Sequence, residues 1–391
     1  MPKIDIYNKI LLNILALDKG FEEFEFYHTF LGKKELSKQA SLIPIENACS
    51  FLKETLKDIN NLGIKDEFPY YRKTYIRDLL KCVIAQTDFF VFKKKIPFKT
   101  LEKDITAAPI LEPFNIQKEF EQSSKKIKDL AGMTIKQMRL AKYEEVNCFK
   151  ELKKYVSKII EENIYLLNEY NVLFSQFDLA AITSKMKIKI VNEEANGSPC
   201  FFKYNGNYCA TIGLAYSKNV SKKFLKGFVR HEGIPGHFLY YCIKQYLADG
   251  GKTDAASLID TFYSPENCLN EGLAVCSDLI FTKLVLPHEQ ADVEAEKLLH
   301  KIFYNLWHSA NIKDKSTSLE YKLLKEYFNL SGGPGRLIKY FTKDEKYYTP
   351  YYPYGIHYAQ KYIPKIKKEN LGFLYHQHSV NTLKKLTEEQ L

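Results

Sequence analysis

The sequence FVRHEGIPGHFL, residues 228–239, contains two histidines six positions apart, with a glutamate directly after the first. In zinc hydrolases, two imidazoles on one face of a helix bind the metal, and the glutamate beside the first histidine activates water. His231 and His237 are therefore candidate zinc ligands, and Glu232 is the candidate general base. A histidine on a helix is usually not a ligand, so this motif alone is a weak signal.

The six-residue spacing of the two histidines does not suit a regular helix. The usual spacing of four residues turns the chain by about 400°, which puts both rings on one face, whereas six residues turn it by about 600° and leave the rings about 120° apart. Pro235 has no N–H and its ring crowds the carbonyl of His231, while Gly236 tolerates unusual backbone angles. We therefore expect a kink or bulge near Pro235 that brings His237 back beside His231.

A second motif lies about thirty residues downstream, in ENCLNEGLAVCSD, residues 266–278. A second helix that presents Glu271 would complete a set of two histidines and one glutamate, with an open position for water. Glu266 is an alternative ligand. The small Gly272 would let two helices approach closely, and Asp278 lies near the face of Glu271, where it could hold the distal nitrogen of a ligand histidine. The two motifs at this distance together favour a metal site.

The first half of the chain has the apolar spacing of amphipathic helices. The segments with this pattern are 45–62, 70–93, 114–131 and 135–169. Prolines punctuate the connections, because a proline lacks the N–H that a helix interior needs. We therefore expect residues 1–180 to form an N-terminal helical lobe.

The pattern changes at residues 187–191, which alternate polar and apolar side chains as a strand does. Two further strand-like runs flank Asn205 and Gly206, a pair that supplies the two positive φ angles of a tight hairpin. We expect a mainly α fold with a small antiparallel sheet beside the helix of the two histidines. The catalytic lobe, residues 181–391, would hold the hairpin, both motif helices and a C-terminal helical and aromatic segment. The strand near residues 208–212 is expected at the sheet edge, where an extended substrate could pair with it.

Composition narrows the class of protein. Hydrophobic residues make up 45% and charged residues 27% of the chain, as in ordinary globular proteins. The net charge of +10 comes mostly from lysine, whereas phosphate and base recognition favours arginine. We therefore expect a lysine-rich surface and no nucleic-acid partner; a cleft that attracts acidic substrates is the alternative. The eight cysteines form no CxxC pair and no apolar run could span a membrane, so we expect reduced thiols and a cytoplasmic protein.

The two motifs together resemble a family of bacterial zinc peptidases known as "domain of unknown function 885", a distant relative of the gluzincin metallopeptidases. The pattern of that family is HEAxPGHH followed by EGWAxYxE. This chain has HEGIPGHF at residues 231–238 and EGLAVCSD at residues 271–278. Weaker similarity extends to residues 198–202, and to residues 355–361, which are similar to a PGQALAYK segment. The resemblance covers about half of the chain, mostly residues 185–365.

The resemblance implies a gluzincin-like helical fold, a Zn2+ cofactor and a late tyrosine or histidine that donates to the oxyanion. Tyr354 and His357 are the candidates here. The alternative is that this tyrosine-rich stretch is an aromatic packing layer. Phe238, Leu273 and Cys276 stand where the family has histidine, tryptophan and tyrosine, so substrate preference is expected to differ.

The expected function is cleavage of peptide or amide bonds, with zinc polarising the carbonyl and Glu232 taking a proton from water. One alternative is a specialised zinc amidohydrolase or biosynthetic processing enzyme for a modified peptide or small amide. Another is a non-catalytic binding protein that retains the peptidase fold, although such a scaffold has no need for Glu232. The expected partner is a peptide or amide substrate, with no membrane, and the sequence does not indicate an oligomeric state. His376 and His378, near the C-terminus, are expected on the surface.

Overall fold

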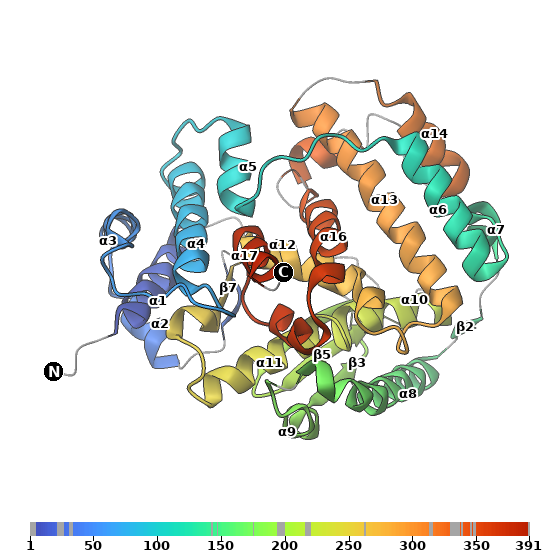
Figure 1. The fold of residues 1–391 in the computed structure, drawn as a ribbon, viewed down its shortest axis with the longest axis horizontal. Coiled ribbons are helices and arrows are strands. Elements are labelled where there is room, and N and C mark those ends of the chain that lie inside the picture. Colours follow the sequence, from blue (N-terminus) through green and yellow to red (C-terminus); the bar gives the residue numbers. More distant parts are fainter. Residues whose placement is uncertain are drawn as a thin grey trace.

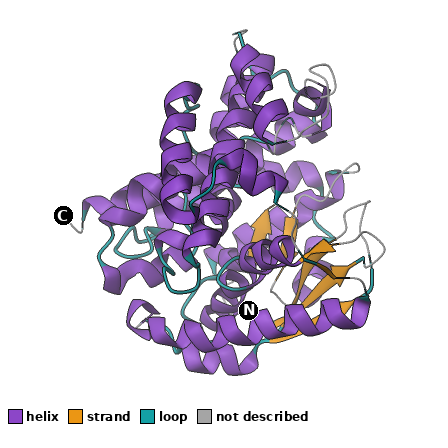
Figure 2. Cartoon of the chain, turned by 90° about the vertical axis from the view of Figure 1, so that its right-hand side faces the viewer, coloured by secondary structure: helices purple, strands orange, loops and turns teal. Residues whose placement is uncertain are grey.

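Helices dominate the chain, and the strands are few and short (Figure 2). The computed structural model describes residues 5–21, 27–30, 34–141, 144–146, 148–174, 176–193, 200–215, 220–261, 263–312, 316–328, 337, 339–344, 346 and 349–389. The predicted mainly α fold class is confirmed. In the described part of the chain, no helix is both long and apolar enough to cross a membrane. Ser198 and Pro199, which contribute to the family resemblance, lie outside the described residues.

The helices follow one another along most of the chain (Figure 1). The α-helices are α1 (Ile6–Leu17), α2 (Lys34–Ala40), α3 (Ile45–Asp58), α4 (Arg72–Gln86), α5 (Phe98–Thr106), α6 (Ile116–Ala131), α7 (Ile135–Leu140), α8 (Phe149–Leu167), α9 (Leu179–Lys185), α10 (Lys222–Phe228), α11 (His237–Asp249), α12 (Pro265–Val275), α13 (Pro287–Asn311), α14 (Ser318–Tyr327), α16 (Tyr351–Tyr362) and α17 (Val380–Glu388). The strands are β1 (Tyr27–Phe30), β2 (Glu145–Val146), β3 (Lys187–Val191), β4 (Cys200–Gly206), β5 (Cys209–Leu214), β6 (Val220–Ser221) and β7 (Ile259–Thr261).

Three of the four helices predicted in the first half are observed as α3, α4 and α6. The fourth prediction, one helix over residues 135–169, is wrong, because α7 ends at Leu140 and α8 begins at Phe149. Between them lies β2, which pairs antiparallel with β6, the strand directly before α10. A strand partner about 75 residues away therefore interrupts a segment whose own pattern is helical.

The predicted hairpin is present as β4 and β5, but its turn is shifted. The positive φ angles of the connection are at Asn207 (51°) and Tyr208 (61°), two residues beyond the predicted pair of Asn205 and Gly206, although Gly206 itself also has a φ of 79°. Tyr208 is buried and its hydroxyl donates to Asp249 of α11 at 3.0 Å. This tertiary contact favours a conformation that a tyrosine rarely adopts.

The sheet order is β3-β5-β4, with β3 parallel to β5 and β4 antiparallel to it. The prediction that residues 208–212 form a sheet edge is therefore wrong, because β5 lies between two partners and its backbone groups are already paired. A substrate therefore finds no unpaired backbone N–H and C=O groups on β5 with which to form strand hydrogen bonds. Buried apolar side chains of β4 and β5 instead support α8 and α10, which pack in the same cluster.

Helix α12 lies in the centre of the molecule, and all of its residues are buried. It crosses α16 at a backbone-to-backbone contact, where a Cβ added to Gly272 would lie 2.1 Å from the carbonyl carbon of Gly355. The expectation that Gly272 permits a close helix approach is therefore confirmed, with α16 as the partner. Only glycine at both positions leaves room for this crossing. The crossing fixes the position of α12, and therefore of Glu271, relative to α16.

The helices of residues 1–180 contact the second half of the chain at several places. In Figure 1, α1 to α5 lie on one side of the central helix α12, while α6 runs along α13 on the other side. The N-terminal helices α1, α3 and α4 share an apolar cluster that also takes in Ala256 and Ile259. Helix α8 lies beside the sheet and α10. These contacts place elements from both halves around the motif residues.

Candidate metal centre

The first motif folds as a helix interrupted at the predicted position. Helix α10 passes into one π-helical turn, Val229–Gly233, and α11 begins anew at His237. Across the break, the N–H of Ile234 donates to the carbonyl of Val229 at 3.1 Å, and that of Gly236 donates to the carbonyl of Arg230 at 3.0 Å. These wider hydrogen-bonded turns take the place of the regular helical hydrogen bond that Pro235 cannot donate. They turn the chain so that His237 comes back toward His231.

A glycine is required at position 236 of this break, because a side chain there would collide with the backbone of the preceding turn. A Cβ added to Gly236 would lie 1.7 Å from the carbonyl oxygen of His231 and 2.6 Å from that of Arg230. No side chain can be accommodated without moving the backbone that carries the first histidine. The glycine predicted from the sequence as a conformational aid is therefore a contact point between the two halves of the motif.

Gly236→Ala is expected to lower zinc affinity by at least about tenfold and to destabilise the fold by about 1–3 kcal/mol, since overpacking costs this much. The matched control is Gly227→Ala in α10, where an added Cβ meets nothing within 4 Å. That change should stabilise the helix by about 0.5–1 kcal/mol. Zinc titration and thermal unfolding of both variants measure the difference; equal behaviour of the two variants would refute the steric argument.

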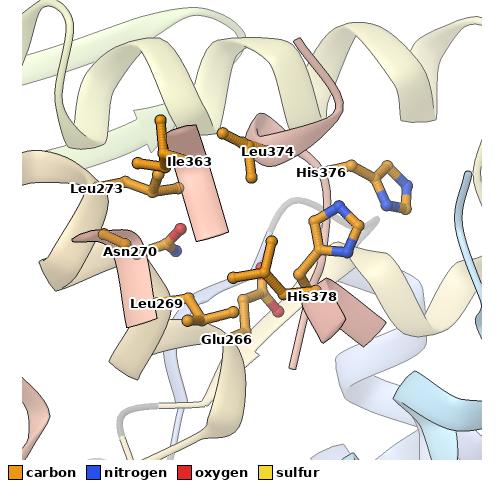
Figure 3. A pocket seen from close by; sticks show the side chains of 10 residues that line it. Glu266, Leu269, Asn270, Leu273, Ile363, Leu374, His376 and His378 are labelled. Atoms are coloured by element: carbon orange, nitrogen blue, oxygen red, sulfur yellow. The ribbon is translucent and has the colours of Figure 1, made fainter. Parts of the chain in front are cut away.

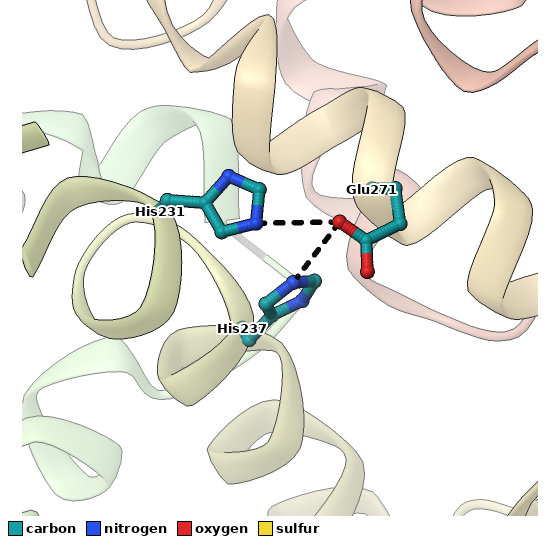
Figure 4. Close-up of side chains that lie close together, drawn as sticks. All are labelled: His231, His237 and Glu271. Carbon is teal, nitrogen blue, oxygen red and sulfur yellow. Dashed lines mark ion pairs between the residues drawn. The ribbon is translucent and has the colours of Figure 1, made fainter. Parts of the chain in front are cut away.

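The break brings three potential ligand atoms together (Figure 4). His231 Nε2 lies 3.2 Å and His237 Nε2 lies 3.6 Å from the same oxygen, Oε2 of Glu271. The two imidazole rings meet edge to face, with centroids 4.9 Å apart. All three ligand atoms lie within 4.8 Å of one another.

These distances can be compared with what zinc requires. Tetrahedral ligands at 2.0–2.1 Å from a zinc ion lie about 3.3 Å from one another. The two nitrogen–oxygen distances, 3.2 and 3.6 Å, bracket this value. Two imidazoles and one carboxylate are also a donor set found in catalytic zinc sites. The residues therefore fit a zinc ion in both chemistry and spacing.

The cluster is largely buried, with the carboxylate of Glu271 only 5% exposed. Burial raises the pKa of Glu271, but the contacts with His237 and His231 outweigh it and hold that pKa well below its usual range. Burial lowers the pKa of His231, but the hydrogen bond with Glu271 and the charges of Glu232 and Glu271 outweigh it and raise that pKa to about 9. The ionised carboxylate and the protonated imidazole therefore stabilise each other's charge in this buried cluster.

Two acidic residues of the second motif have other partners. Asp278, expected to hold a ligand histidine, instead accepts hydrogen bonds from Lys297 at 2.9 and 3.1 Å, so that expectation is wrong. It lies in a short helical turn that begins after α12 ends, and the seven-residue spacing therefore does not keep it on the face of Glu271. Glu266 is buried against Lys244 at 2.8 Å and Tyr75 at 2.5 Å, away from the histidines.

The expectation that His376 and His378 lie on the surface is wrong. Both are buried and line a small cavity with Glu266 and other residues of α12 (Figure 3). The C-terminal segment folds back against α12, and His378 Nε2 lies 2.6 Å from the carbonyl oxygen of Phe373. Burial lowers the pKa of His378 to about 4, so the ring is neutral at pH 7. None of the three candidate ligands, His231, His237 and Glu271, lines this cavity.

The late aromatic candidates also lie elsewhere. Tyr354 is fully buried and packs edge-on against Tyr304 of α13, at 5.8 Å between ring centroids. His357 lies near Phe114, at 6.4 Å. In the contacts that the structure describes, neither residue reaches the histidines of the cluster. Tyr354 thus fits the packing layer that the sequence left open as the alternative.

Among the tyrosines of this stretch that the structure describes, Tyr352 has a ring contact with the cluster. Its ring stacks on His231 at 6.0 Å and, in near-parallel contact, on His300 of α13 at 4.4 Å. Sequence reasoning missed both Tyr352 and His300. Helical periodicity separates Tyr352 from the face of Tyr354 and Tyr358, which stack on each other, but it does not show which face meets the cluster.

A cleft of about 920 Å³ opens beside the cluster. Its lining comes from α10 with its π-helical turn and from α13, with further residues from the end of α6 and from α7. His231, Glu232, His300 and Tyr352 line it. Glu232 therefore has access to a volume large enough for a substrate, next to the candidate ligand His231.

Comparisons with known proteins add little. No family model and no curated protein matches the sequence. Among solved structures, the chain is similar to one described as that of a "putative lipoprotein" from Colwellia psychrerythraea, with a TM-score of 0.48 and 11% identity, over 88% of this chain and 69% of that chain. The function must therefore be argued from the residues of the site.

Proposed function

We propose that this protein is a Zn2+-dependent hydrolase of peptide or amide bonds, with Glu232 as general base and His231, His237 and Glu271 as metal ligands. The observation that carries the proposal is the spacing of the three ligand atoms beside a cleft that Glu232 lines. A scaffold that only bound ligands would have no use for a carboxylate at this position.

The chemistry assigned to the chain is proton transfer and positioning. A bound zinc ion supplies Lewis acidity toward the substrate carbonyl. Glu232 accepts a proton from the water that adds to the carbonyl carbon. It then returns that proton to the amide nitrogen, which leaves as an amine when the C–N bond breaks. We assign oxyanion donation to the O–H of Tyr352, because its ring stacks on His231 and lines the cleft beside Glu232.

Tyr352→Phe is expected to lower kcat by about 100-fold, the effect typical of losing one oxyanion donor, with little change in KM or zinc content. Tyr354→Phe is the matched control, because Tyr354 is buried against Tyr304 outside the cleft lining. That variant should stay within about twofold of the wild type. Steady-state kinetics on the best substrate separates the two, and a loss in Tyr354→Phe alone would restore the sequence-based candidate.

The test of the function is cleavage of a mixed peptide library by zinc-loaded protein, with zinc-loaded Glu232→Gln protein in parallel. Cleavage by the wild type that is absent in the variant supports a peptidase. A wild type that leaves the library intact but hydrolyses one small amide or modified peptide would be the specialised amidohydrolase. Identical product patterns from both proteins would sink the proposal.

A further inference from the structure

The charged side chains of the cleft are arranged in pairs across its two walls. Each pair joins a cation from α10 or its π-helical turn to an acid on α13. The pairs are Lys223 with Asp292, Lys226 with Glu289 at 3.2 Å, and Arg230 with Glu296 at 3.7 Å. Glu232 stays outside these pairs. The three cations of these pairs are therefore neutralised by acids of α13, and Glu232 adds a negative charge to the lining, although the chain as a whole carries +10.

Large apolar side chains also line this cleft, and two of them, Phe224 and Met133, are exposed. Phe224 of α10 is 47% exposed and stacks on Phe228 one turn later, with ring centroids 6.2 Å apart. Met133, just after α6, is 43% exposed, whereas Met138 of α7 is buried behind the cleft surface, at 3% exposed. All four line the same cleft. Exposed apolar side chains that gather in a concave site are typical of a binding surface.

The apolar wall is continuous with the metal cluster. Helix α10 runs directly into the π-helical turn that carries His231 and Glu232, so Phe228 lies three residues before the first histidine. A substrate whose amide reached Glu232 would lay its neighbouring side chain along Phe224 and Phe228. The flexible thioethers of the methionines suit side chains of several shapes.

We propose that this cleft selects substrates with a bulky apolar group, aromatic or long aliphatic, beside the amide to be cleaved. The inference rests on the proposed hydrolase function and names its substrate class. The net charge of the chain suggests acidic substrates instead. We do not expect the cleft to prefer them, because its cations are already paired with acids of α13. Burial of one phenyl ring against this wall should strengthen binding at least tenfold.

Binding without turnover tests this inference. The zinc-loaded Glu232→Gln protein is titrated with two fluorescein-labelled peptides, Ala-Ala-Phe-Leu-Ala-Ala and Ala-Ala-Asp-Glu-Ala-Ala, and anisotropy is measured. The apolar peptide should bind at least tenfold more tightly. Adding Phe224→Ser or Met133→Ser should remove most of that preference, whereas adding Leu42→Ser, at a residue 83% exposed and outside the cleft lining, should leave it unchanged. Equal affinities, preference for the acidic peptide, or no binding of either peptide would overturn the inference.

The same peptides distinguish this inference from the proposed function. If the zinc-loaded wild type binds the apolar peptide through Phe224 but cleaves no peptide or amide, the cleft assignment holds and the hydrolase proposal fails. If the wild type cleaves peptides without regard to apolar groups, the hydrolase proposal holds and the cleft assignment fails.

Discussion

His237→Ala protein is expected to be purified almost free of zinc, whereas the wild type should contain about one zinc per chain. The reason is that one of the three proposed protein ligands is lost. Replacing a residue that merely supports a ligand costs about 10- to 100-fold in metal affinity, so removing the ligand itself should cost more. Elemental analysis of both proteins, followed by zinc titration against a chelator of known affinity, measures the change.

His357→Ala is the matched control for zinc content. It removes the same side chain from α16, near Phe114 and outside the described cluster. This variant should keep its zinc, and circular dichroism should show that both variants are folded. Because His237 is the first residue of α11, replacing its side chain by alanine does not interrupt a regular turn of helix. Full zinc occupancy in His237→Ala would refute the assignment of the cluster.

Glu232→Gln protein is expected to keep its zinc and its fold but to lose at least about 100-fold in hydrolysis, since general bases contribute about 10²- to 10⁴-fold. The amide has nearly the shape of the carboxylate but cannot accept the proton from water. Glu232 lies one residue after a ligand and lines the cleft without being part of the three-atom cluster, so the metal set is unchanged. Initial rates and elemental analysis on the same preparation measure both properties.

Glu162→Gln provides the control for the chemical change. Glu162 is an exposed carboxylate of α8 that pairs only loosely with Lys158, at 3.6 Å, and does not line the cleft. Its replacement should leave hydrolysis within about twofold, as is usual for surface positions. Activity of Glu232→Gln within a few-fold of the wild type would show that the base lies elsewhere, and Glu296 in the same cleft would be examined next.

Features set by local chemistry could be predicted from the sequence. The helix break follows from Pro235, which cannot donate a hydrogen bond, and from Gly236 beside it. The close helix crossing follows from the missing side chain of Gly272. Both arguments use one residue and its immediate neighbours. The same holds for the mainly α class, because apolar periodicity is a property of each segment alone.

Predictions that needed the identity of a distant partner were the ones that went wrong. Asp278 binds Lys297 of the next helix, and residues 135–169 are divided because β2 pairs with β6. The C-terminal histidines His376 and His378 are buried because their segment returns to α12, which no pattern around them indicates.

The cleft shows the same division. The sequence was sufficient to predict that His231, His237 and Glu271 come together as candidate ligands, because their types and spacing resemble those of a metal-binding motif. It could not tell that Tyr352, and not Tyr354, contacts the cluster, since neighbouring tyrosines on one helix differ only in the face that they present. That choice depends on how α16 is rotated against α12 and α13. Packing of whole helices sets this rotation, through contacts between residues far apart in the chain.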